Sequence, residues 1–219
     1  MRTFVISDIH GNNELFRKAL KEVAFKKTDK LILVGDLIDR GPESKGVLDT
    51  VLLMLESGLD VECLMGNHEK LFLDAVLNTN NLNQWLLNGG DKTLSSFLTS
   101  SIEKIPKKYF DFVKSFKYYK EDKNFILVHA AINMKISDPF SDLQTILWER
   151  DQSKYLDSGW LGNRKVVHGH SPKSKTNIIK SFADGEQILG IDNGTFLKKE
   201  DYGAICVLQL ENLKVKFIK

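Results

Sequence analysis

The first third of the sequence alternates short, continuously apolar runs with amphipathic stretches, and this alternation restricts the fold more than any other feature. The apolar runs TFVIS, KLILVG and DVECLMG are separated by the helix-like stretches NELFRKALKEVAF and GVLDTVLLMLESG. Strands that are apolar on both faces are typical of buried parallel sheets, and an amphipathic helix is the usual crossover between two such strands. The pattern therefore predicts a β-α-β-α-β beginning and an α/β fold.

The strand pattern disappears between residues 69 and 116 and then returns. Within this interval the sequence has helical periodicity, interrupted at Gly89, Gly90 and Pro106. The later strand-like runs are NFILVHA, RKVVHGH, QILGID, YGAICVLQLEN and LKVKFIK, with a hairpin turn expected between the last two. We therefore expect a single domain over residues 1–219, with a mixed sheet packed by helices and a small helical, cap-like insertion over residues 69–116.

Charge and cysteine content exclude several classes of partner. The 31 basic and 29 acidic residues leave a formal net charge of +2, a balance that predicts neither nucleic-acid nor membrane binding. Cys63 and Cys206 lie in apolar runs and are expected to be buried thiols of a reducing compartment. No stretch is long and apolar enough for a signal peptide or a membrane span. We expect a cytoplasmic protein, by default a monomer.

Polar side chains gather where five of the apolar runs end. In an open α/β sheet, ligands bind in the crevice outside the carboxyl ends of the strands. The five ends should therefore offer their polar groups to one common place. In chain order these groups are Asp8 and His10; Asp36, Asp39 and Arg40; Asn67 and His68; His129; and His168 and His170.

Each of these clusters also has a purely structural interpretation. An Asp after a strand can form a turn or cap a helix, and a lone His after FILV is more often a core or loop residue than a ligand. The stretch GDLIDRGP could be only a turn around an ion pair between Asp39 and Arg40. This interpretation must treat five strand ends as independent accidents, so we favour one shared site.

The residue types in that site favour divalent metal ions. Carboxylate, amide and imidazole groups without a thiolate suit manganese, iron or zinc better than a soft metal or calcium. The candidate ligands are too many for one tetrahedral ion and suit two ions that share a bridging carboxylate: Asp8, His10, Asp36, Asn67, His129 and His170. A pair of ions activates a water and clamps the attacking and leaving oxygens of an in-line displacement, which is the chemistry of phosphoryl groups.

Together these stretches resemble the calcineurin-like metallophosphoesterases, in particular the bacterial and phage branch of the phosphoprotein phosphatases. The resemblance covers almost the whole chain, and the motifs follow the family's order. They are SDIHG, GDLIDRG, GNHE, VHA, ILWER and GHSP, with WLLNGGDKTLSSF in the middle of the chain. The resemblance implies a four-layer metallophosphoesterase sandwich in which helices flank mixed β sheets.

The resemblance also implies a role for each matching residue. Asp8 and His10 would hold the first ion. Asp36 would bridge the two ions, and the second ion would be held by Asn67, His129 and His170. The ions would be manganese, with iron or zinc as alternatives. A hydroxide bridging them would attack phosphorus directly. Arg40, Arg150 and Asn67 would bind the phosphate, because a planar guanidinium matches two oxygens at once. His68 would protonate the leaving alkoxide, with Asp39 orienting its ring.

Three residue types need separate interpretation. His168 and His170 project to the same side of an extended chain, and the Gly-His-Ser-Pro pattern favours His170 as the ligand, with His168 beside it. Without the family pattern, Arg150 could be an exposed ion pair at a helix end. The three tryptophans are expected to pack in the core and cap, because no basic run lies among them.

We expect a metal-dependent phosphomonoester hydrolase that acts on a phosphorylated protein or peptide. It resembles serine/threonine protein phosphatases of bacterial type, with dual specificity left open. Pro172 stands where the broader phosphodiesterase branch often has a further histidine, which favours the monoester-cleaving branch. The alternative enzyme is a symmetrical diadenosine tetraphosphatase acting on a dinucleoside polyphosphate, or another nucleotide phosphohydrolase. A third hypothesis is a catalytically inactive metal-binding scaffold. It is disfavoured because such a scaffold would not need His68, Asp39 and the two arginines.

Overall fold

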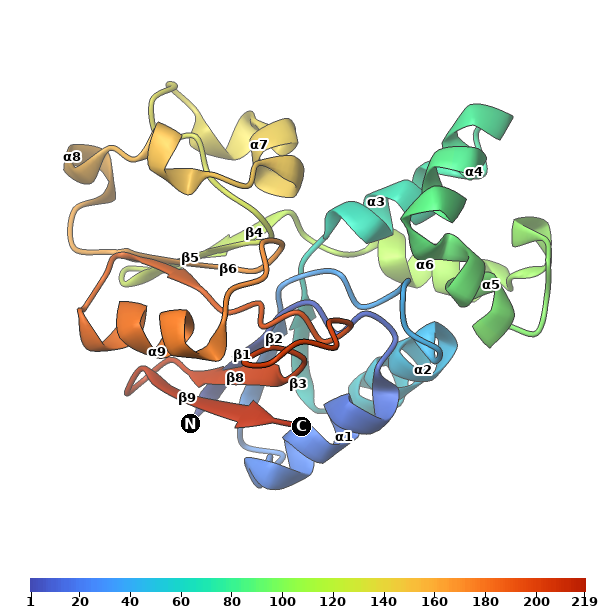
Figure 1. Ribbon diagram of the computed structural model, residues 1–219, viewed down its shortest axis with the longest axis horizontal. Helices are drawn as coiled ribbons and strands as arrows, with labels where there is room; N and C mark the ends of the chain where they lie inside the picture. The colour runs from blue at the N-terminus through green and yellow to red at the C-terminus, as the bar shows by residue number, and fades with distance from the viewer.

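The chain forms two mixed β sheets, seen in a computed structural model that describes residues 1–219 (Figure 1). The strands are β1 (Thr3–Ile6), β2 (Lys30–Leu33), β3 (Asp60–Cys63), β4 (Tyr119–Glu121), β5 (Phe125–Val128), β6 (Lys165–His168), β7 (Ile188–Gly190), β8 (Ile205–Gln209) and β9 (Lys214–Ile218). The first sheet has the order β3-β2-β1-β8-β9, and the second has the order β4-β5-β6-β7. Each sheet therefore combines strands from distant parts of the sequence.

The beginning of the chain has the predicted topology. Strands β1, β2 and β3 pair in parallel, and the crossovers between them are helices α1 (Asn13–Glu22) and α2 (Ser44–Glu56). Strand β8 joins β1 in antiparallel pairing and continues through the predicted hairpin into β9. In the second sheet β5, β6 and β7 are parallel, and β4 is antiparallel at the edge.

The two sheets stack face to face, and successive side chains of each strand point alternately into and away from the space between them. Val5 of β1 packs in one apolar cluster with Leu127 of β5, so these side chains fill the space between the sheets. Phe4 and Ile6 point the other way, into a second cluster that contains Phe16 of α1. Two mixed sheets flanked by helices are the predicted layered α/β architecture, which is confirmed.

The middle of the chain is helical, over α3 (Asn67–Asp74), α4 (Thr79–Trp85), α5 (Asp91–Ser96) and α6 (Lys107–Lys114), with a kink at Gly89 between α4 and α5. These helices form a lobe on the right of Figure 1, away from α7 (Leu143–Trp148), α8 (Ser158–Leu161) and α9 (Lys175–Ala183). The sequence did not predict α7 to α9 or β4. Helices α7 and α8 are too short for a helical period to be visible, whereas Ile178 and Phe182 of α9 are spaced by one turn and could have indicated it.

No helix in the structure has the length and apolar character needed to cross a lipid bilayer.

Cys63 and Cys206 are both buried free thiols. Burial raises the pKa of each thiol far above its ordinary value, so neither is a reactive thiolate at neutral pH. The expectation of buried strand cysteines is confirmed.

Candidate metal and phosphate site

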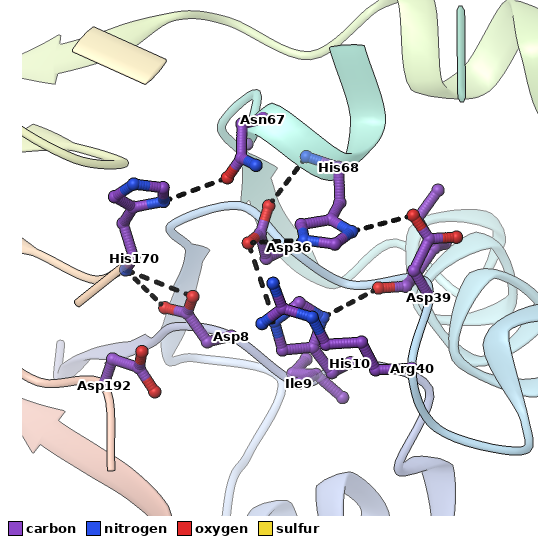
Figure 2. Close-up of polar contacts among 12 residues, drawn as sticks. Asp8, Ile9, His10, Asp36, Asp39, Arg40, Asn67, His68, His170 and Asp192 are labelled. Atoms are coloured by element: carbon purple, nitrogen blue, oxygen red, sulfur yellow. Dashed lines mark hydrogen bonds and ion pairs between the residues drawn. The ribbon is translucent and has the colours of Figure 1, made fainter. Parts of the chain in front are cut away.

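The structure brings the six predicted metal ligands together at the carboxyl ends of strands from both sheets, and Figure 2 labels all of them except His129. They follow β1, β2 and β3 of the first sheet and β5 and β6 of the second. Each is at least nine-tenths buried, with a relative exposure of 7% or less: Asp8, His10, Asp36, Asn67, His129 and His170. Polar side chains are rarely buried to this degree without partners that use their charge or lone pairs.

The loops that carry these side chains have an uncommon backbone conformation. Six non-glycine residues of the site have a positive φ, between 47° and 69°: Asp8, His10, Asp36, Asp39, Arg40 and His170. The left-handed region is unfavourable for most L-residues and persists only where the surrounding structure enforces it. Such residues cluster at functional sites, so the backbone itself marks this edge of the sheets.

Asp36 lies at the centre, with one carboxylate oxygen toward each half of the site. Its Oδ2 is 3.6 Å from Nε2 of His10, and its Oδ1 is 3.4 Å from Nε2 of His129. Two groups of possible ligand atoms share Asp36, one with His10 and His68 and the other with His129 and His170. Asp36 therefore has the position that a carboxylate bridging two ions requires.

Hydrogen bonding directs unprotonated ligand atoms toward one another in the second half of the site. Nδ1 of His129 donates to the carbonyl of Val34 at 2.9 Å, and Nε2 of His170 donates to the carbonyl of Trp148 at 3.2 Å. A carbonyl only accepts, so the other nitrogen of each neutral ring carries a lone pair. These two nitrogens are 3.2 Å apart and lie 2.9 and 3.0 Å from Oδ1 of Asn67. Three acceptors converge without a proton between them, which fits a bound cation.

The first half of the site offers a further imidazole lone pair, which accepts from the guanidinium of Arg40 at 3.0 Å. Nδ1 of His10 donates to the carbonyl of Ile38 at 3.0 Å, which leaves Nε2 as the lone-pair atom that faces Asp36. Both oxygens of Asp8 lie 3.1 Å from the backbone N–H of His170, so this bond joins the two halves. Burial raises the pKa of Asp8 well above its ordinary value, and the nearby carboxylates of Asp192 and Asp36 raise it further. Crowded buried carboxylates also fit a bound cation.

The pKa values of the imidazoles suit metal ligation. Burial lowers the pKa of His129 to about 3 and that of His170 to about 2, and it lowers the pKa of His10 well below its ordinary value. All three rings are therefore neutral at pH 7, and a neutral imidazole is the form that binds a metal ion. His168 is buried, donates from Nδ1 to the carbonyl of Gly169 at 3.0 Å, and belongs to neither ligand group.

His68 and Asp39 form the predicted pair beside the ligands. Nδ1 of His68 lies 2.8 Å from Oδ2 of Asp39, whereas Nε2 is buried without a hydrogen-bond partner and lies 3.9 Å from Oδ2 of Asp36. Burial lowers the pKa of His68 to about 3, and the charges of Arg40 and Arg150 lower it further. Burial raises the pKa of Asp39 to about 8, opposed by the hydrogen bonds that its carboxylate accepts. The unpartnered Nε2 is thus directed at the ligand cluster.

The two predicted phosphate-binding arginines differ in their surroundings. Arg40 is half-buried, donates to Nε2 of His10 at 3.0 Å, and lies with its guanidinium 4.4 Å from the ring centre of Phe196. Arg150 follows α7, is exposed, and uses its backbone N–H to bind Glu149. Its charge nevertheless lowers the pKa of both His68 and His170. Arg40 is therefore ordered within the site, and Arg150 is at its rim.

Three further residues support the site and were not predicted as part of it. The carboxylate of Glu69, in the GNHE stretch, accepts the backbone N–H groups of Asp36, Leu37 and Gly66 at 2.7, 2.8 and 3.0 Å. It thereby ties the loop after β2 to the loop after β3. The other two are Trp85 and Thr93 of the helical lobe, both of which contact Asp39. The sequence signal for Trp85 and Thr93 was their place in the WLLNGGDKTLSSF stretch.

The fold and the site define a hydrolase of phosphate esters that works with metal ions. The family model described as calcineurin-like phosphoesterase matches residues 1–207. This chain belongs to that family and is a metallophosphoesterase, an enzyme whose family uses a dinuclear divalent metal centre.

Individual relatives point to two kinds of substrate. Serine/threonine-protein phosphatase 2 of Salmonella typhimurium is 31% identical over 97% of this chain and 92% of its own length. The symmetrical bis(5'-nucleosyl)-tetraphosphatase of Pseudomonas putida is 32% identical over 74% of this chain, but the match spans only 55% of that relative. A Saccharomyces cerevisiae protein serine/threonine phosphatase has a similar fold, with a TM-score of 0.69 over 100% of this chain and 80% of its own, at 12% identity.

Proposed function

We propose that this enzyme is a phosphomonoesterase that dephosphorylates serine or threonine in proteins or peptides. The observation that carries the proposal is the position of Asp36, whose two oxygens face separate groups of imidazole ligands. The near full-length similarity to a bacterial protein phosphatase supports the choice of substrate. Manganese is the metal we propose, with iron and zinc as alternatives that the same ligand types accept.

The proposed mechanism assigns two sets of ligands and one acid. Asp8, His10 and Asp36 would hold one ion, and the other would be held by Asp36 together with Asn67, His129 and His170. Two divalent ions bound there supply an activated water and neutralise charge that develops on the phosphoryl oxygens. Arg40 and Arg150, joined by the amide of Asn67, would bind the remaining phosphate oxygens and align the ester with His68.

His68 would donate its proton from Nε2 to the leaving alkoxide, because that atom is free and faces the cluster. Before substrate binds, burial and the two arginines hold the pKa of His68 near 3. A phosphate dianion placed between those arginines offsets their charge and adds its own, and both changes favour the imidazolium. Asp39 fixes the ring through Nδ1 at 2.8 Å, so the proton carried on Nε2 points toward the ester.

The second candidate function is hydrolysis of a dinucleoside polyphosphate, which the similarity to the tetraphosphatase of Pseudomonas putida supports. The same metal and phosphate ligands serve both reactions. We propose that the helical lobe over residues 69–116 acts as a cap-like insertion whose surface selects between the two leaving groups. A peptide phosphatase needs an open approach to the ester, whereas a tetraphosphatase must also bind nucleosides.

Direct comparison of the two substrates tests this choice. The protein is stripped of metal with a chelator, restored with manganese, and assayed on a phosphothreonine peptide and on diadenosine tetraphosphate in one series. We expect no turnover after stripping, and after restoration a kcat/KM at least about tenfold higher for the peptide, equivalent to roughly 1.4 kcal/mol of transition-state stabilisation. Preference for the dinucleotide would reject the protein-phosphatase proposal while leaving the metal assignment in place.

A further inference from the structure

We infer that Trp85 and Thr93 of the helical lobe are positioning residues for the acid pair formed by His68 and Asp39. The inference deepens the proposed function and rests on it, because it assigns to α4 and α5 the positioning of the acid pair. Trp85 ends α4, and Thr93 lies in the first turn of α5. Both are buried, with relative exposures of 0% and 1%.

The two side chains donate to the same Asp39 carboxylate that binds His68. Nε1 of Trp85 lies 3.1 Å from Oδ1 and 3.0 Å from Oδ2 of Asp39, and Oγ1 of Thr93 donates to Oδ1 at 2.6 Å. The Thr93 hydroxyl also accepts the backbone N–H of Asp39 at 3.1 Å. With Oδ1 fixed in this way, Oδ2 is left to accept from Nδ1 of His68 at 2.8 Å. The carboxylate therefore has one available orientation.

The glycine pair between these residues allows the lobe to approach so closely. Gly89 has a φ of +102°, and its carbonyl accepts the backbone N–H of Arg40 at 3.2 Å. A Cβ atom on Gly90 would lie 2.4 Å from the indole ring of Trp85, closer than real contacts allow. The spacing of Trp85, the two glycines and Thr93 thus places two donors on Asp39 and one acceptor on Arg40. This accounts for the WLLNGGDKT stretch within the site.

The competing explanation is that Trp85 only packs in the core. The hydrogen bond from its Nε1 to Asp39 distinguishes a positioning role from packing alone. The ring of Trp85 packs on Phe72 of α3 at 5.5 Å between ring centres, and Phe can supply that packing. The N–H group, in contrast, has only the Asp39 carboxylate as its partner. Loss of either donor should let the carboxylate turn and the His68 ring tilt. The step that needs the acid should then suffer more than the binding of phosphate.

The experiment compares W85F and T93V with the rescue variant T93S and the matched control W160F. Trp160 lies on α8, on the other side of the molecule from α4 and α5 (Figure 1), with Arg164 over its ring. We measure kcat and KM for a phosphothreonine peptide and for para-nitrophenyl phosphate, whose leaving group needs little protonation. In W85F and T93V we expect kcat on the peptide to fall by about 10-fold to 100-fold, with KM unchanged and a much smaller loss on the aryl ester. T93S should recover most of the rate, and W160F should match the unmodified enzyme.

A nuclear magnetic resonance measurement gives a readout that does not depend on turnover. In zinc-loaded protein labelled with ¹⁵N-histidine, the Nδ1 proton of His68 should be protected from exchange by its bond to Asp39 and should exchange faster in W85F and T93V. Equal kinetic losses on both esters, or an unchanged Nδ1 proton in both variants, would overturn the inference. Failure of the unmodified enzyme to cleave either ester would instead reject the proposed function, while the proton measurement still judges the positioning of His68.

Discussion

Replacement of Asp36 by Asn is expected to abolish turnover while leaving the fold intact. The carboxylate faces His129 with one oxygen and His10 with the other, at 3.4 and 3.6 Å, and accepts the backbone N–H of His68 at 3.1 Å. An amide keeps the shape but has one oxygen and no charge, so it can support only one side of the site. We expect kcat on para-nitrophenyl phosphate to fall by about 1000-fold or more, equivalent to roughly 4 kcal/mol. Bound manganese should fall below two ions per chain.

The control for this variant is Asp29→Asn. Asp29 is also buried, with a relative exposure of 3%, but it binds Arg2 far from the ligand cluster. Its loss should reduce stability and leave the metal content of the folded protein unchanged. An Asp36→Asn protein that binds two ions and keeps more than about a tenth of the kcat would contradict the assignment of Asp36 as the bridge.

The second large effect is expected for His68→Asn. Its Nε2 atom is buried, unpartnered and directed at the cluster, and its Nδ1 atom is held by Asp39. General acid catalysis typically contributes 10²-fold to 10⁴-fold, and we expect a loss of about that size in kcat for the phosphothreonine peptide. An ester with a leaving group of low pKa should partly restore the rate, because the departing oxygen needs little protonation.

The size of this rescue decides the role of His68. A plot of log kcat against leaving-group pKa for a series of aryl and alkyl phosphates should be steeper for His68→Asn than for the unmodified enzyme. Parallel lines, meaning equal loss on good and poor leaving groups, would show that His68 holds the ligands in place and donates no proton. Metal content measured on the same samples separates these two explanations.

Much of the site could be predicted from the sequence because its residues follow buried strands directly. An apolar run such as FVIS or FILV fixes where a strand ends, and parallel strands place their carboxyl ends at one edge. Asp36 and His129 therefore lie together as predicted, with 3.4 Å between Oδ1 and Nε2, although they are 93 positions apart in the sequence. The family motifs then distinguished His170 from His168, which periodicity alone left open.

Other features depend on tertiary contacts that leave little trace in a single sequence. The residues alone indicated a mixed sheet, and the division into stacked sheets came only with the family resemblance. An apolar run shows that a strand forms but not which other strand it pairs with. Trp85 was expected to be a packing residue, and it does pack on Phe72, but its N–H binds Asp39, which lies 46 positions away. Hydrogen bonds across that distance cannot be recognised from composition or period.

The most direct test of the central claim, a two-ion centre joined by Asp36, is the number of ions that restores activity. The protein is stripped with a chelator, titrated with manganese, and assayed on para-nitrophenyl phosphate at each step, with bound metal measured by inductively coupled plasma mass spectrometry. We predict negligible turnover without metal and full turnover only as occupancy reaches two ions per chain. Full activity at one ion per chain, or activity that survives complete removal of metal, would contradict this account.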